Sequence, residues 1–439
     1  MNIHIENGNA SNRWGLILSL ILGFLYFGAF WRPGSFIAML LCLFGLLVFF
    51  FLTRSNTSKN IMQKNEKLFA YALLFFFLSA LISFIIGHGY ELKSIRNPSM
   101  PSFLDIDLAS KYCLGSLLFV LFCKLKFPLQ KKIVFYSIAL GGIVCGAFAT
   151  YQRYALGWGR VCGLSGIAEF ADQSAILCIL SMIIFSFFAN KKEKPFFAFS
   201  IFASSFAMLA TGTRGASLGI ILTGFAFLFF VWFYQRAFIK KALFASLFCL
   251  MGFACIVLFS GGIKDSLRVE SAMSDMEYYD HGYTHTSLGA RFEMWKEAIA
   301  MFKMAPFFGL STYEISHRLK EIREKSGSAI RRDGERDSRN EAVGNKHNQI
   351  LNTAAKRGIV GVLALLFVWF AYGKLFYHFL RSQQSQIFAL ALCALLIGFY
   401  YLFPNSLTGD VWESNASVPL IILSVCCFYK LILQERESA

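Results

Sequence analysis

The chain has 439 residues, of which 56% are hydrophobic and only 15% carry a charged side chain. A soluble chain normally carries about 25% charged residues. The 50 phenylalanines add more apolar surface than a soluble core of this size buries. The composition therefore excludes an ordinary soluble enzyme and predicts an all-α membrane protein with one integral membrane domain over residues 1–439. The net charge of +16 is better explained by cytoplasmic lysines and arginines than by nucleic-acid binding.

Twelve apolar runs follow one another along the chain, and each approaches the roughly 20 residues that a helix needs to cross a bilayer. They cover residues 14–30, 35–52, 68–87, 112–127, 133–150, 171–189, 195–210, 215–234, 242–260, 358–377, 386–403 and 417–433. The pattern predicts a polytopic protein with about 12 transmembrane helices. Most of the 11 cysteines lie inside these runs without CxxC or Cys/His spacing, so neither a disulfide framework nor a zinc site is expected.

Alternate short connections differ in positive charge. The richer set holds Arg54, Lys59, Lys64 and Lys67, then Lys124, Lys126, Lys131 and Lys132, then Lys191, Lys192 and Lys194, then Arg236, Lys240 and Lys241, then Lys374 and Arg381. Short loops rich in lysine and arginine remain in the cytoplasm. Both chain termini are then cytoplasmic, and the long connection after the ninth run faces the periplasm.

That long connection covers residues 261–347, and its positive and negative side chains balance. Apolar residues at Phe292, Trp295, Ile299 and Phe302 recur at helical spacing, which predicts a helix over 288–308. Residues 325–344 have no apolar period and are expected to form a mobile loop. The chain therefore carries a long, partly helical periplasmic loop between its ninth and tenth transmembrane helices.

Three arginines at the outer ends of the predicted spans are candidate anion ligands. Arg214 lies in the short turn TGTRGAS, Arg160 lies among glycines, and Arg291 begins the predicted loop helix. A guanidinium group matches phosphate oxygens bidentately. The alternative for each is an ordinary interfacial or surface cation.

His347 ends the polar connection and is the candidate for proton transfer. An imidazole with an unperturbed pKa near 6.5 accepts a proton at neutral pH, although a lone histidine is more often structural. Outer-face carboxylates are scarce: Glu169, Asp172, Asp410 and Glu413. No paired-acid metal motif is evident among them, so no metal or other cofactor is expected, and arginines would stabilise the charge of a leaving group.

Three motifs together resemble the superfamily of O-antigen ligases and O-antigen polymerases. They are Thr211–Ala216 around Arg214, Gly289–Trp295 around Arg291, and His347-Asn348-x-x-Leu351 followed by glycines. The long connection between the ninth and tenth spans matches as well. One departure is that Lys356 and Arg357 precede Gly358, where the superfamily often has an acidic residue.

The resemblance implies an inverting, metal-independent glycosyltransferase whose site faces the periplasm at the bacterial inner membrane. The donor would be a glycan on undecaprenyl pyrophosphate, and the ligase acceptor would be a hydroxyl of the lipid A–core oligosaccharide. Carried over, Arg214 and Arg291 bind the pyrophosphate, with Arg160 as a third candidate. His347 acts as the base on the acceptor hydroxyl or orients it.

Three alternatives to the ligase remain open. Two belong to the same superfamily: a polymerase that extends the glycan on its carrier, and an O-oligosaccharyltransferase that modifies protein. The third is a transporter of lipid-linked glycan. A transporter would carry charged or helix-breaking residues near the middle of its spans, and these spans have few of either.

Overall fold

The computed structural model describes residues 2–52, 62–91, 103–259, 269–284, 286–328, 346–407, 409 and 411–438, and the regular structure in these ranges is helical. Its long helices are α1 (Asn2–Phe27), α2 (Gly34–Leu52), α3 (Lys64–Ile86), α4 (Leu104–Lys124), α5 (Lys131–Thr150), α6 (Ile167–Phe187), α7 (Lys194–Ala210), α8 (Arg214–Tyr234), α9 (Ile239–Phe259), α16 (Gln349–Tyr377), α17 (Ser385–Tyr400) and α18 (Ser417–Glu437). Between α9 and α16 lie α11 (Val269–Asp280), α12 (Ser287–Met304), α13 (Thr312–His317) and α14 (Leu319–Ser326). Short turns of 3-10 or π helix are η1 (Gly28–Phe30), η3 (Gly89–Glu91), η4 (Tyr151–Ala155), η5 (Arg236–Phe238), η6 (His378–Arg381), η7 (Tyr401–Asn405) and η8 (Val411–Glu413). The predicted all-α fold is confirmed.

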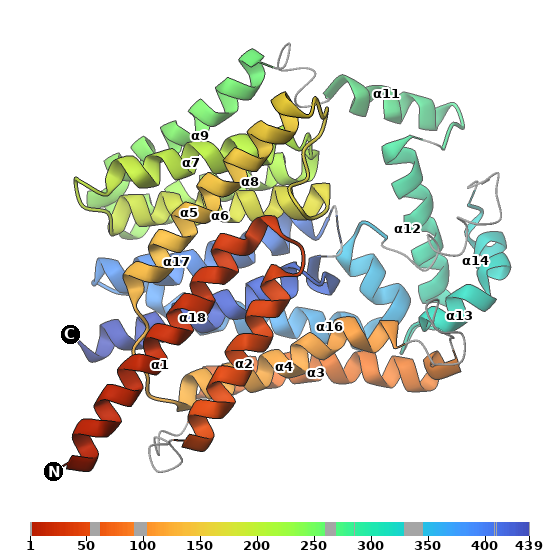
Figure 1. The fold of residues 1–439 in the computed structure, drawn as a ribbon. Helices are drawn as coiled ribbons and strands as arrows, with labels where there is room; N and C mark the ends of the chain where they lie inside the picture. Colours follow the sequence, from red (N-terminus) through yellow and green to blue (C-terminus); the bar gives the residue numbers. More distant parts are fainter. Residues whose placement is uncertain are drawn as a thin grey trace.

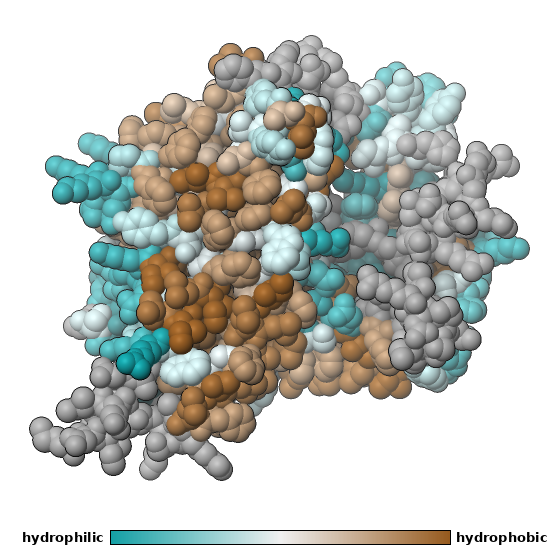
Figure 2. All heavy atoms as spheres, viewed as in Figure 1, coloured by the Kyte–Doolittle hydropathy of each residue, from teal (hydrophilic) through white to brown (hydrophobic). Residues whose placement is uncertain are grey.

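The greater part of each predicted apolar run lies in one long helix. Within the described residues, nine helices are long and apolar enough to cross a membrane, and three shorter apolar segments, Ser11–Phe27, Lys194–Ala210 and Ser385–Tyr400, bring the set to the predicted twelve. Figure 2 shows hydrophobic residues gathered over the middle of the bundle and hydrophilic residues toward its ends. The chain is a multi-pass membrane protein.

Three predicted helix starts were wrong by eight residues or more, and the first helix begins at Asn2 rather than at residue 14. The fourth helix begins at Leu104 rather than at residue 112, because the polar first turns extend the helix beyond its apolar part. The tenth begins at Gln349 rather than at residue 358, and Gly358 interrupts it with φ 61° and ψ −160°. The periodic signal stopped at the kink, whereas the helix continues on both sides of it.

Successive long helices run in alternating directions, so both chain termini lie at one end of the bundle (Figure 1). The opposite end, called the site end below, is where α6, α8, α16 and α18 begin. Helices α6 and α18 form the centre: their apolar windows are 94% and 89% buried, against 17% for the peripheral α9. A polar residue near the start of α6 is therefore held in the interior of the bundle.

Helices α12, α13 and α14 lie beyond the site end, where they cap part of the bundle (Figure 1). The predicted helix is confirmed as α12, although its buried side carries Glu293, Glu297 and Met301, whereas Ile299 of the predicted apolar stripe is exposed. Thr286 caps its start, and the Thr286 hydroxyl accepts a hydrogen bond from Gly289 N at 3.1 Å. A small apolar core joins this group to the start of α16: Ala298, Met301, Leu310, Ile315, Ile322 and Ala355. Most of the predicted mobile loop (325–344), and the first residues of the 261–347 connection, lie outside the described residues.

Two glycines let the segment after α12 cross the kink of α16. A Cβ on Gly358 would lie 2.3 Å from the Phe307 carbonyl carbon, and a Cβ on Gly309 would lie 2.2 Å from the Arg357 nitrogen. Both have positive φ, 61° and 70°, which glycine adopts without steric cost. Ile359 N donates to Pro306 O at 2.8 Å across this crossing. The group of α12–α14 is thereby fixed to the bundle through backbone contacts.

Candidate functional site

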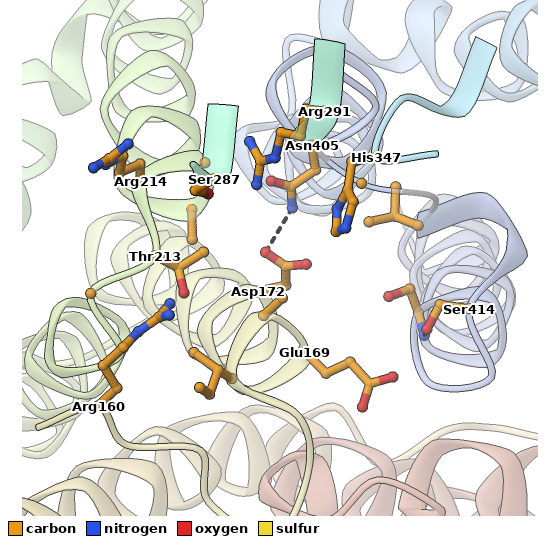
Figure 3. A pocket seen from close by; sticks show the side chains of 18 of the residues that line it. Arg160, Glu169, Asp172, Thr213, Arg214, Ser287, Arg291, His347, Asn405 and Ser414 are labelled. Atoms are coloured by element: carbon orange, nitrogen blue, oxygen red, sulfur yellow. Dashed lines mark hydrogen bonds between the residues drawn. The ribbon is translucent and has the colours of Figure 1, made fainter. Parts of the chain in front are cut away.

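A cavity of about 410 Å³ lies at the site end, between the bundle and α12 (Figure 3). Its walls come from the starts of α6, α8, α12 and α18, from the loop after α17, and from the residues before α16. The unpaired N–H groups at a helix N-terminus carry partial positive charge. Several helix N-termini around one cavity favour an anion there.

The cavity brings together all four residues that the sequence singled out. Arg160, Arg214, Arg291 and His347 line it (Figure 3). They come from four separate segments of the chain, spread over 188 positions of sequence between residues 160 and 347.

Arg160 reaches the cavity from the loop between η4 and α6. Its Nε donates to the carbonyl of Thr211, in the turn before α8, at 2.8 Å. The buried side chain of Gln152 organises this loop: its Oε1 accepts from Cys162 N and Gly163 N at 2.9 Å each, and its Nε2 donates to Gly163 O at 2.7 Å. One amide side chain thus sets the path of the glycine-rich loop that carries Arg160.

Arg214 is the first residue of α8, and two of its guanidinium nitrogens donate no hydrogen bond to a described residue. Its Nη1 lies 3.6 Å from Asp275 Oδ2, with the arginine side chain 27% exposed. Its Nε and Nη2 are buried and have no hydrogen-bond partner among the described residues. A buried donor without a partner costs free energy. An anion that accepts from these groups would recover that cost.

Arg291 lies one turn into α12 and faces the same cavity (Figure 3). Burial lowers the pKa of Arg291, and the charge of the neighbouring Arg214 lowers it further. The second cause means that the two guanidinium groups repel each other across the cavity. A bound anion between them would remove this repulsion.

His347 has a left-handed backbone, with φ 50°, which is uncommon for a residue other than glycine. Its neighbours on both sides are held in place. The Lys346 ammonium lies 3.2 Å from Glu297 Oε2, and Trp295 Nε1 donates to the Lys346 carbonyl at 3.1 Å. On the other side Asn348 Oδ1 accepts from Leu351 N at 3.1 Å and so caps α16. These contacts fix where the imidazole enters the cavity.

A buried polar network supports the first turns of α16 from behind. Arg357 Nη2 lies 3.2 Å from Glu413 Oε1, and both side chains are almost fully buried. Asn352 Nδ2 donates to Glu413 Oε2 at 2.9 Å. The arginine at the position that departs from the superfamily pattern therefore has a structural partner. Glu413, one of the outer-face acids of the sequence, belongs to this network and does not line the cavity.

Some cavity residues carried no predicted role. Asp172 and Glu169 line it, and the sequence identified them only as scarce outer-face acids. Asn405 and Ser414 also line it and were missed, because isolated Asn and Ser residues near span ends give no sequence signal. Asp410 lies outside the described residues. Among the described residues, no group of three or more His, Cys, Asp or Glu side chains could hold a metal ion.

Comparison with known proteins finds a family match over part of the chain. The model of the O-antigen ligase family matches residues 198–366, a segment that contains Arg214, Arg291 and His347. This match and an O-antigen ligase among the relatives support the O-antigen ligase superfamily for this chain. Two relatives extend the likeness beyond the matched segment. An O-antigen ligase of Escherichia coli is 24% identical over 339 residues, covering 76% of this chain and 74% of the relative. An uncharacterized protein of Haemophilus influenzae is 26% identical over 381 residues, covering 82% of this chain and 87% of that protein.

Proposed function

We propose that this protein is an O-antigen ligase. It transfers a glycan from undecaprenyl pyrophosphate to a hydroxyl of the lipid A–core oligosaccharide, at the periplasmic face of the bacterial inner membrane. The observation that carries the proposal is the convergence of Arg160, Arg214, Arg291 and His347 on one cavity at the end of a membrane bundle. In this orientation residues 261–347 form the periplasmic loop of a single membrane domain, and both termini are cytoplasmic.

The pyrophosphate of the donor binds the three arginines. Arg214 offers two buried donor atoms without partners among the described residues. Arg291 lies close enough for the charge of Arg214 to lower the pKa of Arg291. Planar guanidinium groups pair with phosphate oxygens through parallel hydrogen bonds. The cavity lies where the bundle meets the outer helices, so the polyprenyl chain remains in the bilayer while its head group enters from the side.

The chemical step is a direct displacement at the anomeric carbon. The acceptor hydroxyl gives its proton to a ring nitrogen of His347 as its oxygen forms the new glycosidic bond. The bond between the anomeric carbon and the phosphate oxygen breaks, and undecaprenyl pyrophosphate leaves with the electron pair. Attack opposite the leaving group inverts the configuration. The arginines stabilise the negative charge that develops on the leaving oxygen, so the mechanism requires no metal ion.

Deletion of the gene, followed by analysis of lipopolysaccharide, tests the proposal. A ligase predicts that lipid A–core carries no long glycan and that polymer accumulates on the lipid carrier. Complementation with the wild-type gene restores ligation, and His347→Ala does not. A single repeat unit on lipid A would identify a polymerase instead. Unchanged lipopolysaccharide would overturn both, and loss of glycan from protein alone would identify a protein O-oligosaccharyltransferase.

A further inference from the structure

Asp172 is a buried carboxylate, and one of its two oxygens accepts two hydrogen bonds within the protein. It lies near the start of the central helix α6, is 7% exposed, and lines the cavity. Tyr400 Oη and Asn405 Nδ2 both donate to Oδ1, at 3.0 and 2.8 Å. No described residue donates to Oδ2. A carboxylate is an acceptor only, so Oδ2 is available to a hydrogen-bond donor in the cavity.

The position of Asp172 within the cavity suggests what completes its hydrogen bonding. Figure 3 shows its carboxylate between Arg160 and Arg214 on one side and His347 on the other. On the proposed function, the leaving pyrophosphate occupies the arginine side and the acceptor hydroxyl occupies the histidine side. The sugar that carries the reacting anomeric carbon must then lie between them, beside Asp172.

The other cavity carboxylate is already in use. Glu169 Oε2 accepts from Gly166 N at 3.3 Å, which caps α6, and lies 3.4 Å from Arg32 Nε. Asp172 has no such cation partner among the described residues. Tyr400 and Asn405, from the end of α17 and η7, hold only its Oδ1, so they orient the carboxylate and leave Oδ2 for a ligand.

We propose that Asp172 contacts the transferred sugar directly. Its Oδ2 accepts a hydrogen bond from a hydroxyl or amide N–H of the first sugar of the donor glycan. Its negative charge, next to the anomeric carbon, favours the positive character that this carbon develops as the phosphate departs. Asp172 is then a catalytic residue, and Tyr400 and Asn405 are positioning residues. This proposal rests on the proposed glycosyl transfer.

Asp172→Asn separates this role from a structural one. The amide oxygen of the new side chain still accepts from Tyr400 and Asn405, so the internal contacts remain. The cavity-facing atom changes from an acceptor to a donor, and the charge is lost. With purified protein and undecaprenyl-pyrophosphate-linked glycan, kcat for transfer to lipid A–core should fall by about 100-fold or more, within the range found when one transition-state contact is removed.

A second measurement distinguishes loss of a sugar contact from general damage. Binding of undecaprenyl pyrophosphate without a sugar should be as tight in Asp172→Asn as in wild type, or tighter, because a negative charge near the phosphates is gone. Disruption of the cavity would weaken this binding as well. Glu169→Gln is the matched control and should retain transfer within about threefold. In the wild-type protein the Glu169 carboxylate already contacts Gly166 N, at the start of α6, and Arg32.

The results of these experiments distinguish an error in the role of Asp172 from an error in the proposed function. Transfer by Asp172→Asn within threefold of wild type, or parallel loss of transfer and pyrophosphate binding, overturns the role of Asp172. If Asp172→Asn does not accumulate, Asp172→Ser takes its place, and failure of both assigns Asp172 to folding and also overturns the proposal. Absence of transfer by the wild-type protein contradicts the proposed function instead.

Discussion

Glu297 compensates two positive charges at once, and its removal should release the segment that carries His347. Its side chain is 3% exposed; Oε2 lies 3.2 Å from the Lys346 ammonium, which is 1% exposed, and Oε1 lies 3.7 Å from Arg323 Nε. Glu297→Gln keeps the size of the side chain and removes the charge. Lys346 then loses the carboxylate that lies 3.2 Å from its buried ammonium, directly before His347.

The size of the effect follows from burial. Removing one partner of a buried ion pair costs about 3–5 kcal/mol, because the remaining charge loses the compensation of that partner. Since about 1.4 kcal/mol corresponds to a factor of ten, separation of α12 from the start of α16 should become about 100- to 4,000-fold more frequent. Lys346→Met should cost less than Glu297→Gln, because Glu297 then still faces Arg323.

Hydrogen–deuterium exchange of α12 peptides measures this local opening without requiring reversible global unfolding. Glu321 provides the matched control, because it also faces two cations, Arg318 at 2.9 Å and Lys325 at 2.6 Å, but at the surface. Exposed pairs contribute little, so Glu321→Gln should leave exchange almost unchanged. Wild-type exchange in Glu297→Gln, or equal effects of the two substitutions, would refute the reasoning from burial.

Four further substitutions, at three positions, test the site and its support. His347→Ala and His347→Asn should both abolish transfer by purified protein while the protein accumulates; asparagine tolerates the left-handed backbone but accepts no proton, so activity in that variant would remove the base assignment. Arg214→Lys should lower the transfer rate at least about tenfold, because an ammonium lacks the bidentate fork, and a wild-type rate would indicate an ordinary interfacial cation. Gly358→Ala places a Cβ 2.3 Å from the Phe307 carbonyl carbon at φ 61°. It should lower the melting temperature in detergent through a loss of about 1–3 kcal/mol, and unchanged melting would contradict the tight crossing.

The bundle was predictable from the sequence because transmembrane helices are specified locally. An apolar run of sufficient length must form helix in lipid, since backbone polar groups have no other partner there. The errors arose where tertiary contacts extend a helix beyond its apolar run. The first turn of α4 is fixed by Asp105, which accepts from Thr312 N at 2.9 Å. The start of α16 is covered by α12–α14, and neither arrangement has a periodic signature.

The cavity residues were predictable only as separate candidates. Arg160, Arg214, Arg291 and His347 stand out by residue type and by their place at span ends. What holds them depends on partners far away in the chain, such as Asn352 with Glu413, separated by 61 positions. Asp172 shows the same limit, because Tyr400 lies 228 positions away. A single sequence contains no local pattern for such pairs.

The placement of His347 relative to the three arginines depends on the contact between α12 and the bundle. Arg160, in the loop before α6, and Arg214, at the start of α8, belong to the bundle. Arg291 belongs to α12, and Lys346, which precedes His347, is held by Glu297 and Trp295 of the same helix. The cavity is thus complete only when α12–α14 are seated on the site end. The close backbone contacts at Gly358 hold α12–α14 in this position. Backbone contacts allow less adjustment than contacts between flexible side chains. On the proposed function this arrangement favours the transfer of a glycan between two lipid-anchored substrates, because the rate of displacement falls steeply when the reacting groups are misplaced by about 1 Å.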